Sequence, residues 1–209
     1  IPGSRRLLVM AEGIASALTV TADAEPVASE TRIVAIDTAQ LADIGATLPR
    51  PVAIRVTDTS GRPLTDIPVG WVALDGGALT PLAPRTDSLG EARVEGTLSN
   101  RAGTQRLRAQ VGTTRAVPPI VPTATAKPGT ASTAWIVGGN TQAGTVGAAL
   151  GKKVAIKVLD RAGNPVPSAI VYFAPVRGSV ADSAIMADTS GISRAVWTLD
   201  REPGPHSMS

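Results

Sequence analysis

Apolar and polar residues alternate with a period of two along several short segments of the 209-residue chain. The alternation is clearest within residues 52–58 and 106–111, where the apolar positions are Val52, Ile54, Val56, Leu107, Ala109 and Val111. Because successive side chains of a strand point to opposite faces, this pattern predicts strands with one buried face. Residues 39–46 come nearest to a helical period, but Gly45 weakens that interpretation. The chain is therefore predicted to be all-β.

Turn signals separate the predicted strands. Residues 58–61 and 160–163 both read Asp-x-x-Gly, where the Asp side chain can accept a hydrogen bond from the backbone two residues on and Gly supplies a positive φ. Residues 87–90 and 188–191 form a second pair of turns, each predicted to close a hairpin. Pro118, Pro119 and Pro122 fall in the last predicted strand, which should therefore lie at a sheet edge or carry a bulge.

A large aromatic residue occupies the third predicted strand. Val69 and Trp71 share one face there, and Val171 and Phe173 do the same 102 residues later. An aromatic side chain that faces the opposite sheet is how a two-layer sandwich fills its core. The predicted fold class is a set of tandem immunoglobulin-like β-sandwich domains in an elongated rod.

The whole pattern repeats after about one hundred residues. Residues 52–58 recur as 154–160, and 87–90 recur as 188–191. The start of the chain joins the same series, because Gly3 and Arg6-Leu7 match Gly103 and Arg106-Leu107.

The repeat predicts three segments. Residues 1–24 are the last two strands of a preceding module, expected at 5–11 and 15–22, and are candidate donor strands. Residues 31–126 form a complete module, and 133–209 form a module that lacks its last strands. Pro26 and Pro128 lie in the joints between them and predict a semi-rigid connection.

Composition narrows the function. Aromatic residues make up 2% of the chain, with 21 Gly and 17 Pro, which suits short strands and turns better than an aromatic-walled ligand pocket. Cysteine is absent, which removes thiol catalysis and thiolate metal sites. The net charge of +3 is scattered and no apolar run reaches about 20 residues, so neither nucleic acid nor a membrane span is expected in this segment. The first residues read as a chain entered in mid-structure, and any targeting signal is expected outside them.

Candidate chemical residues are few. His206 is the single histidine and is interpreted as a surface residue, and motifs for a nucleophile elbow, phosphate loop or zinc helix are absent. We therefore predict no enzyme activity and no catalytic, cofactor-binding or metal-binding residue. Four isolated aspartates are interpreted as turn caps, with calcium binding left as the alternative: Asp58, Asp87, Asp160 and Asp188. Three tryptophans are assigned to core or interdomain packing, with Trp135 the one expected to meet a neighbouring domain: Trp71, Trp135 and Trp197.

Three motifs occur in both copies: Val-x-Asp-x-x-Gly-x-Pro at 56–63 and 158–165, Thr/Ala-Asp-x-x-Gly at 86–90 and 187–191, and Thr-Leu-x-x-x-x-Gly at 97–103 and 198–204. Together they resemble the bacterial immunoglobulin-like group 1 repeats of invasin- and intimin-type surface proteins. The resemblance implies an extracellular tandem array at the bacterial cell surface, a stalk that projects an adhesive tip. The cysteine-containing lectin-like tip of some family members has no counterpart in this sequence.

Two explanations of the partial modules remain open. The chain is either a piece of a longer tandem array, or a subunit whose first strands complete the last module of an identical neighbour, giving a filament by head-to-tail strand complementation. Residues 2–8 and 203–209 would compete for the same strand position under both. The expected partners are neighbouring modules or identical subunits, end to end. The alternative function is a carbohydrate- or receptor-binding module on a sandwich scaffold.

Overall fold

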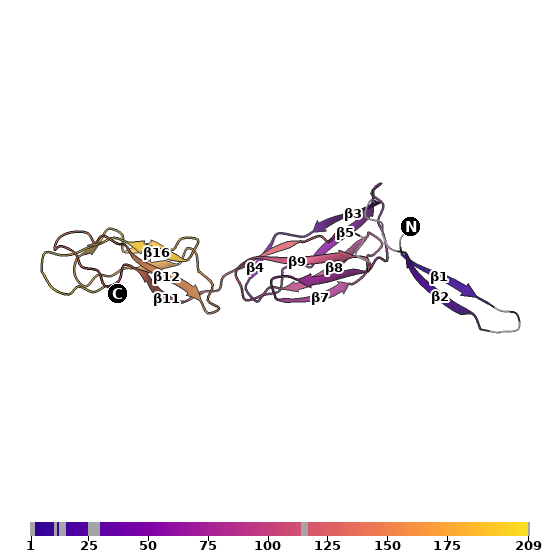
Figure 1. Cartoon of the computed structure of the whole chain (residues 1–209), viewed down its shortest axis with the longest axis horizontal. Coiled ribbons are helices and arrows are strands. Elements are labelled where there is room, and N and C mark those ends of the chain that lie inside the picture. The colour runs from indigo at the N-terminus through magenta and orange to yellow at the C-terminus, as the bar shows by residue number, and fades with distance from the viewer. Residues whose placement is uncertain (1–2, 11, 13–15, 25–29, 114–116, 209) are drawn as a thin grey trace. The chain divides into compact units, whose positions relative to one another are not determined.

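The computed structural model describes residues 3–10, 12, 16–24, 30–113 and 117–208. It divides into unit 1 (Ile1–Lys127) and unit 2 (Pro128–Ser209). The described residues form strands, turns and no α-helix (Figure 1), so the all-β prediction is confirmed.

The strands of unit 1 are β1 (Gly3–Val9), β2 (Leu18–Ala24), β3 (Thr31–Ile36), β4 (Gln40–Asp43), β5 (Val52–Asp58), β6 (Val69–Ala73), β7 (Ala78–Ala83), β8 (Glu91–Thr97), β9 (Gly103–Val111) and β10 (Thr123–Lys127). Those of unit 2 are β11 (Ala131–Gly138), β12 (Val154–Asp160), β13 (Ile170–Tyr172), β14 (Ser179–Val180), β15 (Ala184–Met186), β16 (Ile192–Ala195) and β17 (Trp197–Thr198).

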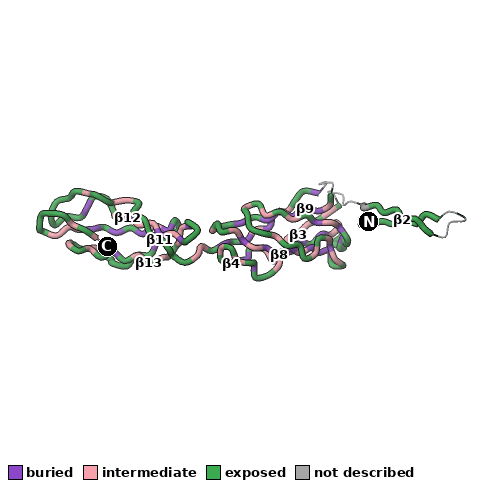
Figure 2. Tube along the Cα trace, turned by 90° about the horizontal axis from the view of Figure 1, so that it is seen from below, coloured by how far each residue is buried: buried purple, intermediate pink, exposed green. Residues whose placement is uncertain are grey.

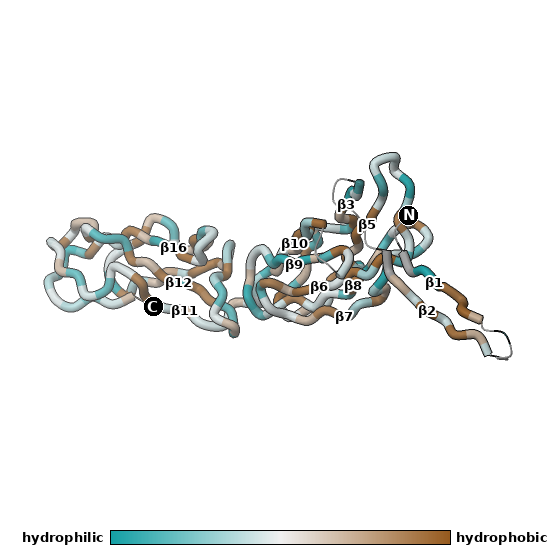
Figure 3. The backbone as a smooth tube through the Cα atoms, turned by 45° about the vertical axis from the view of Figure 1, so that its right-hand side comes forward, coloured by the Kyte–Doolittle hydropathy of each residue, from teal (hydrophilic) through white to brown (hydrophobic). Residues whose placement is uncertain are grey.

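The first two strands form the N-terminal hairpin, β1–β2. They pair antiparallel, with Gly3 opposite Ala24 and Val9 opposite Leu18. Apolar residues are frequent on both strands (Figure 3), yet the side chains described here are exposed (Figure 2). The hairpin therefore presents apolar surface that no described residue covers.

The rest of unit 1 is a two-layer sandwich. One sheet has the strand order β3-β5-β8-β7 and the other β4-β10-β9-β6. In immunoglobulin nomenclature these are the A-B-E-D sheet and the G-F-C sheet, with β4 added alongside the last strand. This topology follows from strands whose one apolar face must be covered by another sheet.

The core of the sandwich has two clusters, one toward each end of the strands. Val52, Ile54 and Val56 are fully buried, as their alternation predicts. Trp71 is half-buried and contacts both clusters, so an aromatic side chain does fill the middle of the core.

The prolines before β10 agree with the prediction only in part. Pro118, Pro119 and Pro122 precede β10, and only the carbonyl of Pro122 joins the β9 ladder, accepting from Leu107 at 2.9 Å. The strand β10 itself lies between β9 and β4 and is not an edge. The pairing with β4 begins only at Ala124, whereas Ile120 and Pro122 pair with β9 alone, so the proline-bearing residues lie at the sheet edge although β10 does not.

Unit 2 repeats part of this plan. Its sheet β11-β12-β16 corresponds to β3-β5-β8, and β14 pairs with β17 as β7 pairs with β8. Met208 forms a bridge with Pro175, as Leu107 does with Ala73 in unit 1. Residues 204–208 thus take the first positions of a strand equivalent to β9.

The two units differ in how well they cover equivalent residues. Val52 and Ile54 have no exposed surface, whereas their counterparts Val154 and Ile156 are half-buried. In unit 1 the facing strands β9 and β10 cover these positions. Among the described residues of unit 2, only 204–208 lie at equivalent positions, so part of the inner face remains accessible.

Candidate functional site

The four candidate aspartates are caps of turns. Asp58 accepts hydrogen bonds from the Ser60 hydroxyl at 2.7 Å and from the backbone N–H groups of Ser60 and Arg62, both at 2.9 Å. The Ser60 hydroxyl, followed by the Arg62 N–H, lowers the pKa of Asp58 to about 2. Asp188 has the same pattern with Ser190, and hydrogen bonds from Ser190 and Arg194 hold its pKa far below the ordinary value.

The carboxylates of Asp87 and Asp160 also accept hydrogen bonds from backbone N–H groups. The Glu91 N–H, above all, lowers the pKa of Asp87. Burial acts to raise the pKa of Asp160, but hydrogen bonds from Asn164, Gly129 and Ala162 outweigh it and lower the pKa. The turn-cap interpretation therefore accounts for all four carboxylates.

The residues that the structure describes contain no group of three or more His, Cys, Asp or Glu side chains arranged to hold a metal ion. Over the same described residues, no helix is long and apolar enough to cross a membrane.

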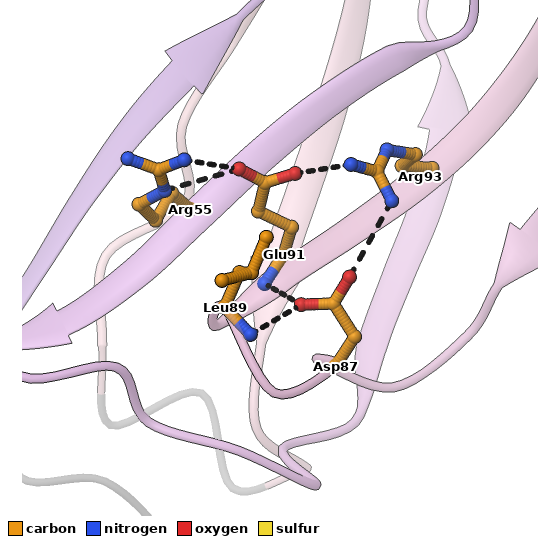
Figure 4. Close-up of polar contacts among 5 residues, drawn as sticks. All are labelled: Arg55, Asp87, Leu89, Glu91 and Arg93. Carbon is orange, nitrogen blue, oxygen red and sulfur yellow. Dashed lines mark hydrogen bonds and ion pairs between the residues drawn. The ribbon is translucent and has the colours of Figure 1, made fainter.

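The sequence interpretation missed an ion-pair network on the β3-β5-β8-β7 sheet (Figure 4). Glu91, only 5% exposed, lies opposite Arg55 on β5 and binds both Arg55 and Arg93. Arg93 also reaches Asp87, at 3.4 Å. The signal was available: the Glu-x-Arg spacing puts Glu91 and Arg93 on one face of β8. The charges are mutually paired, so the network is accounted for by contacts within the fold.

The tryptophans have different surroundings. Trp197 is 9% exposed, and its Nε1 donates to the carbonyl of Arg177 at 3.0 Å, as expected of a core residue. Trp135 is 63% exposed and does not pack in the core of unit 2, and its expected contact with a neighbouring domain stays a prediction. Its counterpart Ile33 packs against the core cluster that contains Ala109 and Val111 of β9, and these two residues have no equivalent among the described residues of unit 2.

His206 is not the surface residue predicted from sequence. Its side chain is 6% exposed, with Nε2 at 2.8 Å from Asp200 Oδ1 and Nδ1 at 2.9 Å from the Gly204 carbonyl. The His206 ring packs edge-on against the Trp197 ring, with 6.3 Å between the ring centroids. The prediction failed because these contacts form only when residues 204–208 fold back beside β13. Arg177 pairs with Asp200 at 3.2 Å and with Glu202, which completes the cluster.

A groove of about 590 Å³ opens beside this cluster in unit 2. Its apolar wall includes Gly144, Leu150, Val154, Trp197, Leu199 and Met208, and we call it the unit 2 groove. The equivalent space in unit 1 is a closed core, where Ala124 and Ala126 of β10 pack on Leu48, Val52 and Leu98. The groove is therefore the position of a strand equivalent to β10. Its lining also includes polar residues: Asn140, Thr141, Gln142, His206 and Ser207.

No protein-family model and no curated protein sequence matches the chain. Similar solved structures include FdeC, an Escherichia coli adhesin, with 17% identity and a TM-score of 0.46 over 99% of this chain and 68% of that one. Invasin, a bacterial integrin-binding protein, has 17% identity and a TM-score of 0.46 over 100% of this chain and 42% of its own. InvD of Yersinia pseudotuberculosis has 18% identity and a TM-score of 0.41 over 100% of this chain and 65% of its own. The turn motifs of the sequence resemble this same invasin-type group.

Proposed function

We propose that the chain is a load-bearing part of an extracellular surface protein of bacteria, an immunoglobulin-like stalk or filament. Its contacts are end to end, between neighbouring modules or between identical subunits that exchange strands. The repeat of about one hundred residues and the three shared turn motifs support this function.

The observation that carries the proposal is the pairing of β4 with β10. In the sequence of the sandwich β4 lies near the start and β10 at the end. In space the two strands run parallel and side by side, with Gln40 opposite Ala124 and Asp43 opposite Lys127. A tension applied at residues 31 and 127 pulls parallel neighbours in opposite directions along their axes. The hydrogen bonds between them, including Ile44 N–H to Lys127 O at 3.0 Å, are then loaded together in shear instead of one after another. Such an arrangement resists force.

Two buried glutamines allow a matched test. Gln40 anchors β4 by three hydrogen bonds, two to the Arg50 backbone and one to the Asp37 carbonyl. Gln105 on β9 makes three equivalent bonds, to the backbone of Ser99 and Arg101. They are 7% and 4% exposed. The Q40A and Q105A variants should lose similar thermal stability, but only Q40A frees a strand of the loaded pair.

The measurement is single-molecule stretching of the full chain. We expect unit 1 to unfold in one event that releases about 300 Å of chain, at a force that Q40A lowers and Q105A leaves nearly unchanged. Equal losses of force in the two variants, or unfolding without a resolved force peak, would overturn the load-bearing role.

A receptor-binding role is favoured by one observation. Ile170, Tyr172 and Met186 share a face of the β13–β15 ribbon and are 56%, 71% and 67% exposed. Their counterparts Pro68, Gly70 and Arg85 form no such patch. A ligand whose binding is lost in Y172A, with unfolding under force unchanged, would support this second function.

A further inference from the structure

We propose that a pocket at one end of the unit 1 sandwich binds an acidic sugar, such as a uronic acid, through the carboxylate of the sugar. The cavity has a volume of about 400 Å³, and we call it the arginine pocket after its lining: Asp75, Arg101, Ala102, Thr104, Gln105 and Arg106. These residues come from the β6–β7 turn, the β8–β9 turn and the start of β9. The inference goes beyond the load-bearing role and does not depend on it.

Asp75 holds the first of the two arginines in place. The Arg106 guanidinium donates from Nε to Asp75 Oδ2 at 2.9 Å and from Nη2 to Oδ1 at 2.8 Å, and the Arg106 backbone N–H donates to Oδ2 at 2.8 Å. These hydrogen bonds lower the pKa of Asp75 to about 2, so its carboxylate is ionised at neutral pH. The third nitrogen of the guanidinium, Nη1, has no hydrogen bond with a described residue. It can therefore donate to a ligand.

The second arginine, Arg101, has a fixed backbone and a free side chain. Gln105, only 4% exposed, accepts a hydrogen bond from the Ser99 N–H at 2.8 Å and donates one to the Arg101 carbonyl at 2.6 Å. The Arg101 guanidinium is exposed and has no hydrogen bond or ion pair with any residue that the structure describes. After the hydrogen bonds from Arg106, its charge is a further cause of the lowered pKa of Asp75, which places it close to that carboxylate. The turn thus presents a cation in a fixed place.

The charge and lining of the arginine pocket suit an acidic sugar. Two arginines against one aspartate leave a net positive charge, and the planar guanidinium matches a carboxylate with two parallel hydrogen bonds. The volume leaves room for a sugar ring beside the carboxylate. The lining contains no aromatic side chain for an apolar ligand, and the exposed hydroxyl of Thr104 has no hydrogen bond with a described residue. That hydroxyl can bind a sugar hydroxyl.

The second copy of the repeat shows that the fold does not require these charges. The position of Asp75 is occupied in unit 2 by Arg177, and the position of Arg101 by Glu202. Arg177 and Glu202 form an ion pair with each other, and Arg177 also pairs with Asp200 at 3.2 Å. The same turns therefore form with the signs of the charges reversed. The positive pocket is particular to unit 1, and a structural need of the turns does not account for it.

The test is an NMR titration of the full 21.2 kDa chain, labelled with nitrogen-15, with glucuronate and with glucose. The two sugars share a ring and differ in the carboxylate, which glucose replaces with a hydroxymethyl group. We expect glucuronate to shift the amide signals of residues 101–106 with a dissociation constant of about 1 mM, and to leave those of 52–58 in place. Glucose should bind at least about tenfold more weakly, because it cannot pair with the arginines.

Arg101 and Arg32 provide a matched pair of variants. Both are exposed and neither guanidinium has a partner among the described residues, but Arg32 lies on β3 in the other sheet. We expect R101Q to weaken glucuronate binding at least about fivefold and R32Q to change it less than about twofold. The R101E variant, which carries the residue type of unit 2, should abolish binding. Because Gln105 binds the Arg101 carbonyl and not its side chain, the turn should persist, and the amide signals of the variants outside residues 99–106 check this.

Each other result would overturn the proposal. Absence of shifts up to about 20 mM glucuronate would show that the pocket does not bind it. Equal losses in R101Q and R32Q would indicate a general attraction of anions, and equal affinities for glucose and glucuronate would remove the role of the carboxylate. Acetate or sulfate that binds as tightly as glucuronate would show that the pocket takes a bare anion and not a sugar. The stretching experiment is unaffected by any of these results, so the load-bearing role stands or fails separately.

Discussion

At the scale of single residues, the carboxylate of Glu91 joins two neighbouring strands through Arg55 and, on its own strand, binds Arg93. A shift of the β5–β8 register by one residue would turn Glu91 and Arg93 to the opposite face of the sheet, away from Arg55. The network therefore favours the native register more than it adds affinity between strands, since the arginine side chains are 49% and 43% exposed and solvent weakens their attraction.

Replacing Glu91 tests that role. In E91Q the side chain keeps its shape but loses its charge, which leaves two arginines with a weak acceptor. We expect the free energy of unfolding of unit 1 to fall by about 1–3 kcal/mol, measured by urea titration. Glu95 is exposed on the same face of β8, and E95Q should change stability by less than about 0.5 kcal/mol. Equal effects of the two variants would contradict a special contribution of the network.

The turn aspartates predict an acid-sensitive stability. The folded pKa of Asp58 is about 2 against an ordinary 3.8, and the pKa of Asp188 is lower still. A depressed folded pKa gives stability that is present above the unfolded pKa and is lost as pH falls through the folded value. The urea midpoint should therefore be constant above about pH 5 and decrease between about pH 4 and pH 2. D58N combined with D188N should make the decrease shallower, and an unchanged slope would rule out these carboxylates as its cause.

At the scale of elements, local sequence patterns correctly predicted the strands and turns, because these depend on residues close together in the sequence. The alternation at 52–58 indicated a strand because one face is buried, and Asp-x-x-Gly indicated turns because Asp58 and Gly61 fix their own backbone. Non-local pairings left no such trace. The parallel contact of β4 with β10 depends on two segments 84 residues apart, and the burial of His206 depends on where residues 204–208 return to the sheet.

The turn between β7 and β8 yields a prediction about glycine. Gly90 has a φ of +73°, and a Cβ added there would lie 2.4 Å from the Val56 carbonyl oxygen. Gly61 has a φ of +85° with open space around it. Thermal unfolding should show that G61A costs about 1–2 kcal/mol for its left-handed backbone, and that G90A costs clearly more because β5 must also move. If G61A and G90A lose the same stability, the close approach of Gly90 to the Val56 carbonyl oxygen does not contribute to the cost.

At the scale of the whole molecule, the central strand of each unit has a neighbouring strand on both sides, but the inner faces of the two strands are buried to different extents. β5 lies between β3 and β8, and β12 lies between β11 and β16, so both central strands have ladders on two sides. Differences in amide exchange between them therefore report how well the facing layer covers each unit. This separates packing from hydrogen bonding in a single chain.

In dilute protein, we expect residues 154–160 to exchange their amides faster than 52–58, because Val154 and Ile156 are half-buried where Val52 and Ile54 are fully buried. Hydrogen exchange followed by mass spectrometry measures both segments in one sample. Equal protection of 154–160 and 52–58 would show that the difference in burial between the two units does not control their amide exchange.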